Sequence, residues 1–109
     1  MATITAQTVT ATGLAPVYSA VTASDQFIPD PNGLVYHVKN ASGASINVTV
    51  TDAGFSPAGN VGGNPVVAVP AAGERFIYLN PALVNAATGF ITVAHSGTTS
   101  VTAALFRGV

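Results

Sequence analysis

A two-residue alternation of apolar and polar side chains is the sequence feature that most constrains how this chain folds. It is clearest over residues 34–40 and 45–52, where Tyr36 and His37 fall on opposite sides of the predicted strand. Successive side chains of a β-strand point to opposite faces, so this period predicts strands with one face in a core and one toward solvent. The small residues 41–44 between the two segments predict a loop, and the stretch is therefore predicted to be a β-hairpin.

Similar short β-forming segments recur along the chain. Further strands are predicted over residues 4–10, 66–69, 74–79, 90–95 and 100–107. Turns are predicted at residues 30–33 and 70–73, and the only helical turn expected is a short one over 82–87 with Asn80 as its N-cap and Pro81 at its first position. The sequence therefore predicts an all-β fold, a small antiparallel β-sandwich or barrel of about eight short strands.

The length of 109 residues leaves room for one domain with one core, which we assign to residues 13–109. Residues 1–12 are predicted to be an edge strand or an extended N-terminal arm that pairs with a neighbouring subunit, because chain ends are ordered only when they are tied down. The strands predicted over 90–95 and 100–107 carry apolar side chains on both faces. They are therefore predicted to be central in a sheet or covered by a partner.

Charge is scarce. Three Lys or Arg stand against four Asp or Glu, so 6% of the residues are charged, roughly a quarter of the usual fraction. Nucleic-acid binding needs several cations to neutralise phosphates, so it is not expected. A weakly charged surface does little to keep molecules apart, which favours a surface that is covered in an assembly; an ordinary secreted β-domain is the alternative.

No segment predicts membrane insertion or export. The N-terminus has neither the basic nor the apolar region of a secretory signal, and no apolar run approaches the roughly 20 residues of a membrane-spanning helix. We expect a soluble chain of cytosolic origin with no membrane partner. The glycosylation patterns at Asn40 and Asn47 would matter only on a secretory route.

The chain offers little catalytic chemistry. It has no cysteine, and its two histidines, His37 and His95, lie on predicted strands that could be neighbours but have no third metal ligand spaced beside them. Ser96, His95 and Asp52 could form a hydrolase set only by chance, since no nucleophile-elbow motif is present. The Gly-rich residues 59–64 lack the Lys-Ser/Thr of a phosphate-binding loop. We predict no enzyme activity, no metal, no cofactor and no small-molecule substrate.

Four segments of the chain carry a resemblance to a known family. They are ATITAQTVTATGLAP, LVYHVKNASGASINVTV, VVAVPAAGERFIYL and FITVAHSGTTSVTAALF. Together they resemble small proteins of tailed bacteriophages, particularly of actinobacterial hosts, that are encoded among the head genes and described as head decoration or minor capsid proteins. The most recognisable part is residues 69–75, where this chain has Ala72 in place of the glycine of the family pattern.

The resemblance implies a β-sandwich of jelly-roll or tulip type that is made in the cytoplasm of the bacterial host and sits on the exterior of the virion capsid. Its implied partners are the major capsid protein and further copies of itself, with a trimer favoured. Many modest contacts would then add up through avidity. The expected function is a non-enzymatic one, to bind the capsid and stabilise it.

Partner contacts are predicted in three places. They are the N-terminal segment, the Gly- and Pro-rich residues 53–65 and two rim charges: Ile4, Thr5, Gln7, Val9, Phe55, Asn60, Asn64, Lys39 and Arg75. One alternative is a phage neck or tail component, such as a head–tail stopper or tube-like β-protein. Another is a carbohydrate- or host-surface-binding module, against which stands the lack of exposed aromatics, because Trp is absent and Tyr36 and Tyr78 are predicted to be buried.

Overall fold

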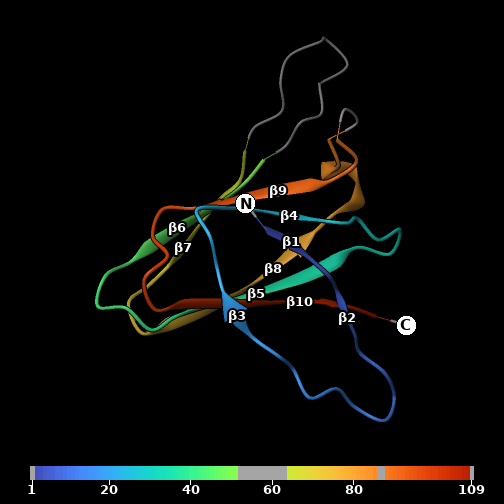
Figure 1. Ribbon diagram of the computed structural model, residues 1–109, viewed down its shortest axis with the longest axis horizontal. Helices are drawn as coiled ribbons and strands as arrows, with labels where there is room; N and C mark the ends of the chain where they lie inside the picture. The colour runs from blue at the N-terminus through green and yellow to red at the C-terminus, as the bar shows by residue number, and fades with distance from the viewer. Residues whose placement is uncertain (1, 52–63, 86–87, 109) are drawn as a thin grey trace.

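Two mixed β-sheets pack together in the computed structural model, which describes residues 2–51, 64–85 and 88–108 (Figure 1). Sheet A has the strand order β1 (Ala2–Ile4), β4 (Ser24–Phe27), β9 (Ile91–His95), β6 (Ile46–Val50) and β7 (Val66–Val69). Sheet B has the order β2 (Gln7–Thr8), β10 (Val101–Arg107), β5 (Leu34–Asn40) and β8 (Gly73–Leu79), and β3 (Ser19–Ala20) also pairs with β10. The predicted β-sandwich is confirmed.

The N-terminal segment joins the two sheets. Strand β1 pairs with β4 in sheet A, and β2 pairs with β10 in sheet B, so residues 2–8 cross from one sheet to the other (Figure 1). Both pairings are parallel, whereas all other strand pairs are antiparallel. Within the structure this segment therefore pairs with strands of its own chain, and Ile4 and Ala6 pack against the core.

The core lies between the sheets and is formed by the inward-facing side chains of both. Phe27 and Tyr36 are fully buried, and their ring centroids lie 4.8 Å apart. Around them lie aliphatic side chains from both sheets: Leu34, Val38, Ile46, Val48, Val50, Val69, Leu79, Ile91, Val93, Val101 and Leu105. The two-residue period of β5 and β6 therefore identified the buried faces correctly.

The predicted hairpin over residues 34–52 is wrong. Strand β5 lies in sheet B between β10 and β8, whereas β6 lies in sheet A between β9 and β7. The connection between them crosses the sandwich, and Asn40 holds it there, because its buried side chain donates to the carbonyl of Ala44 (2.8 Å) and accepts from Ser42 N (3.0 Å). Asn40 is thus a buried structural residue, whereas Asn47 is exposed.

Several local predictions are confirmed. Strand β7 covers the predicted residues, and β8, β9 and β10 differ from prediction by one residue at their first position. Strand β9 lies between β4 and β6, and β10 lies between β5 and β2, so both are central. Asn80 caps a 3-10 turn (η1, Pro81–Leu83) by accepting from Ala82 N at 2.9 Å, as predicted. The predicted extent of the turn, 82–87, is wrong, because Val84 is already extended; residues 86 and 87 lie outside the described residues. The part of the chain that the structure describes has no helix long and apolar enough to cross a membrane.

Candidate functional site

The outer face of sheet B carries an unusual number of aromatic side chains. The strand register places them in neighbouring rows on β10, β5 and β8, and Tyr18 lies over them from the segment before β3. We call this set the aromatic face: Tyr18, Val35, His37, Phe76, Tyr78 and Phe106. Phe76 and Tyr78 are 64% and 61% exposed, values that are high for side chains this large. A contiguous exposed apolar patch is typical of a surface that binds another macromolecule.

His37 lies at the centre of the aromatic face and is 4% exposed. The Phe76 ring stacks on its imidazole with a centroid distance of 3.9 Å and an interplanar angle of 12°. The Tyr18 hydroxyl lies 2.7 Å from Nδ1, while Nε2 is buried and has no hydrogen-bond partner among the described residues. The nearest carboxylate oxygen, Oε1 of Glu74, is 3.6 Å away. An unpaired buried polar atom is costly to the folded chain, so His37 is held in the face by its ring contacts and by Tyr18.

The prediction that His37 lies on a wet strand face is therefore wrong. Its side of β5 faces outward as predicted, but Tyr18 and Phe76 cover it. Lys39, on the same side of β5, places its Nζ 3.9 Å from the centroid of the Tyr18 ring, a cation–π contact that holds Tyr18 in place. The Tyr18 and Phe106 rings also meet edge to face, with centroids 6.4 Å apart.

Tyr78 was predicted to be buried and is instead exposed. Its ring lies against Gly33, which ends the turn that begins at Asp30 and has a φ of +85°. A Cβ atom at position 33 would overlap the Tyr78 phenol, so glycine is required both for the backbone conformation and for the ring contact. The glycine thus keeps the Tyr78 ring flat against the end of the sheet.

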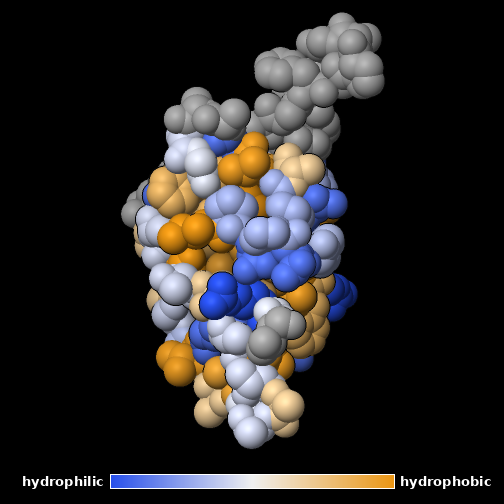
Figure 2. All heavy atoms as spheres, turned by 90° about the vertical axis from the view of Figure 1, so that its right-hand side faces the viewer, coloured by the Kyte–Doolittle hydropathy of each residue, from blue (hydrophilic) through white to orange (hydrophobic). Residues whose placement is uncertain are grey.

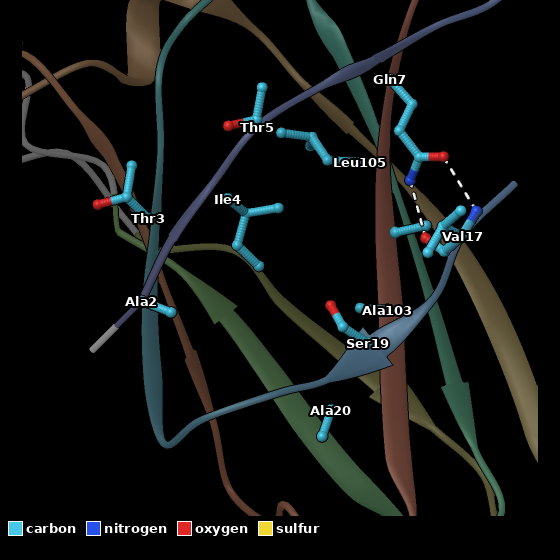
Figure 3. Close-up of a pocket in the computed structure, with 11 residues that line it drawn as sticks. Ala2, Thr3, Ile4, Thr5, Gln7, Val17, Ser19, Ala20, Ala103 and Leu105 are labelled. Carbon is cyan, nitrogen blue, oxygen red and sulfur yellow. Dashed lines mark hydrogen bonds between the residues drawn. The ribbon is translucent and has the colours of Figure 1, made fainter.

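A cavity of about 420 Å³ lies beneath the N-terminal segment, between it, β3 and β10 (Figure 3). The Gln7 amide closes one side by donating to the carbonyl of Val17 (2.8 Å) and accepting from its amide (3.0 Å). The remaining lining is small or apolar and includes Ile4, Ala103 and Leu105. Among the described residues that line this cavity, none is acidic, basic or a histidine.

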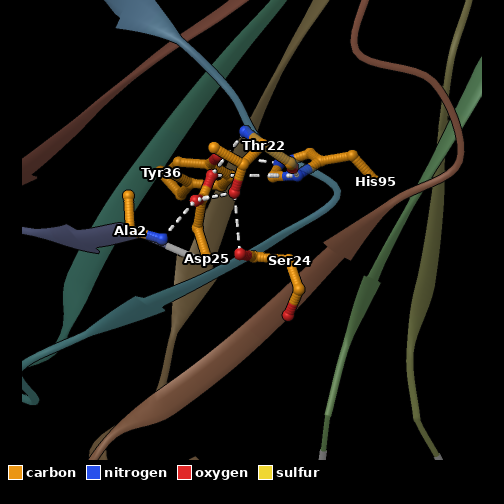
Figure 4. Close-up of polar contacts among 6 residues, drawn as sticks. All are labelled: Ala2, Thr22, Ser24, Asp25, Tyr36 and His95. Carbon is orange, nitrogen blue, oxygen red and sulfur yellow. Dashed lines mark hydrogen bonds and ion pairs between the residues drawn. The ribbon is translucent and has the colours of Figure 1, made fainter.

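A buried polar cluster lies between the sheets (Figure 4). His95 donates from Nδ1 to the Thr22 carbonyl (2.8 Å), and its Nε2 therefore accepts from the Tyr36 hydroxyl (2.8 Å). Asp25, 1% exposed, accepts hydrogen bonds from the backbone amides of Thr22 and Ala2, both at 3.2 Å, and from the Thr22 hydroxyl.

The electrostatics of this cluster favour the neutral forms of His95 and Tyr36. Burial lowers the pKa of His95, although the Thr22 carbonyl and the Asp25 carboxylate oppose that shift. Burial, and secondarily the charge of Asp25, raise the pKa of Tyr36 well above its ordinary value. Thr22, Asp25, Tyr36 and His95 do not line the cavity of Figure 3. The cluster therefore ties β4, β5 and β9 together.

The predicted chemical sites do not assemble. His37 and His95 lie in different sheets, so the expectation that their strands could be neighbours is wrong. Within residues 2–51, 64–85 and 88–108, no three His, Cys, Asp or Glu side chains are grouped to hold a metal. The Ser96 hydroxyl accepts from Asn47 N (2.8 Å), and Asp52 lies outside the described residues.

The predicted contact residues fall in separate places. Ile4, Thr5 and Gln7 line the cavity beneath the N-terminal segment, and Val9 is 46% exposed just beyond β2. Lys39 lies on the aromatic face, and Arg75 is exposed on β8, where it donates from Nη1 to the Glu74 carbonyl at 2.7 Å. Asn64 is exposed just before β7, and Phe55 and Asn60 lie outside the described residues.

The molecular end that carries the C-terminus looks different from the aromatic face. Hydrophilic side chains occupy its middle and hydrophobic ones are scattered around them (Figure 2). In β10, Arg107 donates to the Thr8 hydroxyl (2.9 Å) and pairs with Asp30 (Nη1 to Oδ2, 3.4 Å), so it links β10 to β2 and to the turn before β5. This cation is engaged within the chain, which makes it a poor anchor for an anionic partner.

The sequence of β8 carries a signal for the aromatic face. In β8, Phe76 and Tyr78 alternate with Ile77 and Leu79, so both sides of the strand are apolar. Strand β8 is not central, because it pairs only with β5 among the described strands. An edge strand that is apolar on both sides exposes one of them.

Comparison with known proteins gives no family for the chain. A scan of protein-family models, a search of curated proteins and a search of solved structures each found no match.

Proposed function

We propose that this protein is a non-enzymatic viral structural protein that binds the outer surface of a bacteriophage capsid and stabilises it as a homo-oligomer. The observation that carries the proposal is the aromatic face, which lies on a β-sandwich with only seven formally charged side chains. A surface of this kind docks on a protein without removing many ions from water, a cost that often exceeds the attraction between charges. The family resemblance supplies the capsid as partner.

The chemistry of the aromatic face supports a protein as its partner. Phe76, Val35 and Phe106 have no polar atoms in their side chains, so they gain by excluding water rather than by hydrogen bonding. His37 lies at their centre, but its Nε2 is buried, so the exposed rings of Phe76 and Tyr78 offer the contact surface. Aromatic anchors are typical of the energetic centre of protein interfaces.

The test uses capsids assembled without this protein, to which the purified chain is added. Wild-type protein is expected to sediment with the capsids, to saturate at a copy number comparable to that of the major capsid protein, and to raise the temperature at which the capsids open. The variant Val35→Ser/Tyr78→Ser, which changes one row of the aromatic face, is expected to bind at least about tenfold more weakly. Val66→Ser is the matched control, because Val66 is 58% exposed on sheet A.

Other outcomes would reject this proposal. Equal binding by the row variant and the control would exclude the aromatic face as the docking surface. A few copies per particle would move the protein to the neck or tail. No binding to any part of the particle would reject the viral structural function.

One observation favours a second candidate, a carbohydrate-binding module. Exposed aromatic rings stack on sugars, and Tyr78 and Phe76 provide two that were not expected from the sequence. The candidate is tested by titrating the protein with host cell-wall polysaccharide and following tyrosine fluorescence. Saturable quenching that is lost in the row variant, together with no capsid binding, would favour this candidate over capsid decoration.

A further inference from the structure

Strand β8 is the longest strand at an open sheet edge. It has seven residues and pairs only with β5 among the described strands, whereas the edge strands of sheet A, β1 and β7, have three and four. The outer edge of such a strand presents main-chain donors and acceptors without strand partners, which is a template for pairing with another strand.

The edge is protected only where it begins. Glu74 and Arg75 place charges there, and the Arg75 guanidinium donates a hydrogen bond to the Glu74 main-chain carbonyl at 2.7 Å. Residues 76–79 carry no charge and no proline, and on the outward side of this stretch Phe76 and Tyr78 are exposed. Proline and charge are the usual means of preventing edge pairing, so the second half of β8 lacks that protection.

We propose that β8 pairs antiparallel with β8 of a second copy of this chain, about a twofold axis that passes through Phe76. Because Phe76 is the central residue of β8, only this axis gives each of the seven residues of the strand a partner within β8 of the second copy. Each Phe76 then faces Phe76 of the second copy, each Glu74 faces Tyr78, and each Arg75 faces Ile77. An axis one residue earlier would place two Arg75 side chains directly opposite each other, which is destabilising. The axis at Phe76 is therefore the favoured register.

The chemistry of this register is self-complementary. Aromatic pairs directly opposite each other stabilise antiparallel strands, and a tyrosine hydroxyl can donate to a carboxylate across the strands. The two copies of sheet B become one continuous sheet, and the two aromatic faces lie side by side on it. The inference goes beyond the proposed function, since it concerns contacts between copies in solution, and it differs from the trimer that the family resemblance implies.

The test exploits the fact that residue 76 faces itself across the axis. In sedimentation equilibrium of the full chain, the average mass of the wild type is expected to rise with concentration to twice the chain mass of 10.8 kDa. For Phe76→Lys and for Phe76→Glu, the dissociation constant of the dimer is expected to rise at least tenfold, because two like charges meet at the axis. An equimolar mixture of the two variants is expected to restore the dimer, because Lys and Glu then face each other.

Val66→Lys is the matched control, since it adds the same charge to the edge of sheet A and is expected to leave the dimer unchanged. Circular dichroism verifies that each variant is folded. A wild type that stays monomeric at every concentration, a trimer mass, or a Lys and Glu mixture no more associated than its components would each overturn the proposal. No capsid is present in this experiment, so its failure is distinguishable from a failure of capsid binding.

Discussion

At the scale of single residues, Ala72 occupies a position that favours glycine. It is the third residue of the turn from Pro70 to Gly73, and its φ is 56°. A Cβ atom in this left-handed region costs about 1–2 kcal/mol. We predict that Ala72→Gly raises the free energy of unfolding, measured with urea, by about 0.5–1 kcal/mol, because the extra chain entropy of glycine offsets part of the relief.

The control for this prediction is Ala71→Gly in the same turn. The φ of Ala71 is not positive, so this change adds chain entropy to the unfolded state without relieving strain. It is expected to lower the free energy of unfolding by about 0.5–1 kcal/mol. If Ala72→Gly were no more stable than the wild type, the strain assigned to Ala72 would be absent.

His95 makes stability depend on pH. Burial lowers its pKa from the ordinary value of 6.5, so below that pH the unfolded chain binds more protons than the folded one. The contribution of His95 to the free energy of unfolding is therefore fully present above about pH 6.5. It is lost as the pH falls from there through the pKa of His95 in the folded chain. We predict that the free energy of unfolding of the wild type, measured with urea, falls between pH 7.5 and pH 5.5. For one proton the fall is at most about 1.4 kcal/mol per pH unit.

The comparison variant for His95 is His95→Gln. It is expected to be less stable at pH 7.5, because the Tyr36 hydroxyl loses its acceptor, but to lose less stability on acidification. His37 and all carboxylates are common to both proteins, so the difference in slope reports on His95. Parallel pH profiles for the two proteins would show that His95 titrates alike in the folded and unfolded states.

At the scale of elements, the buried Asn40 side chain holds the crossover between the sheets. Besides its contacts to Ala44 and Ser42, its Nδ2 lies 3.2 Å from the carbonyls of Val69 and Pro70, so it joins the end of β5 to the β7–β8 turn. We predict that Asn40→Ala lowers the free energy of unfolding by about 1–3 kcal/mol, because it leaves buried main-chain groups without partners.

Asn47→Ala is the control for this prediction, since Asn47 is exposed on β6. It is expected to change stability by no more than about 0.5 kcal/mol in the same urea titration. An equal effect of the two substitutions would mean that the crossover does not depend on the Asn40 side chain.

The same element explains how far the sequence predicts the fold. Strand β7 was predicted with its observed bounds, because a short β-branched run between turn residues is a local signal. The partners of β5 and β6, which lie in different sheets, were not predictable in the same way, since a two-residue period identifies the buried face but not the neighbouring strand. The crossover to the other sheet is hydrogen-bonded by Asn40, whose side chain reaches residues about 30 positions away.

The site was predicted less well than the fold, for a related reason. Lys39 was identified as a surface charge, but its partner Tyr18 lies outside any predicted strand, so no periodicity pointed to it. In β8, the alternation of apolar side chains makes both sides of the strand apolar, so it does not indicate which side faces the core. Only the closure of the sandwich decides that Ile77 and Leu79 are buried and that Phe76 and Tyr78 are exposed.

At the scale of the whole molecule, the scarcity of charge predicts how the proposed capsid binding responds to salt. Contacts between exposed charges weaken as salt shortens the screening length, which is about 10 Å at 0.1 M, whereas apolar contacts do not. Arg107 is engaged with Asp30, and Lys39 is held over Tyr18, so two of the three cations are already paired within the chain. We predict that the dissociation constant for capsids changes less than about threefold between 0.05 M and 0.5 M sodium chloride.

Sodium sulfate gives the opposite control, because it is excluded from protein surfaces and strengthens apolar burial. At matched ionic strength it is expected to tighten binding relative to chloride. Arg75→Ala, which removes the third cation, is expected to leave both salt responses unchanged, because Arg75 lies at the start of β8 and outside the rows of the aromatic face. A loss of tenfold or more in chloride, abolished by Arg75→Ala, would instead assign the binding to charge and would remove the aromatic face from its central role.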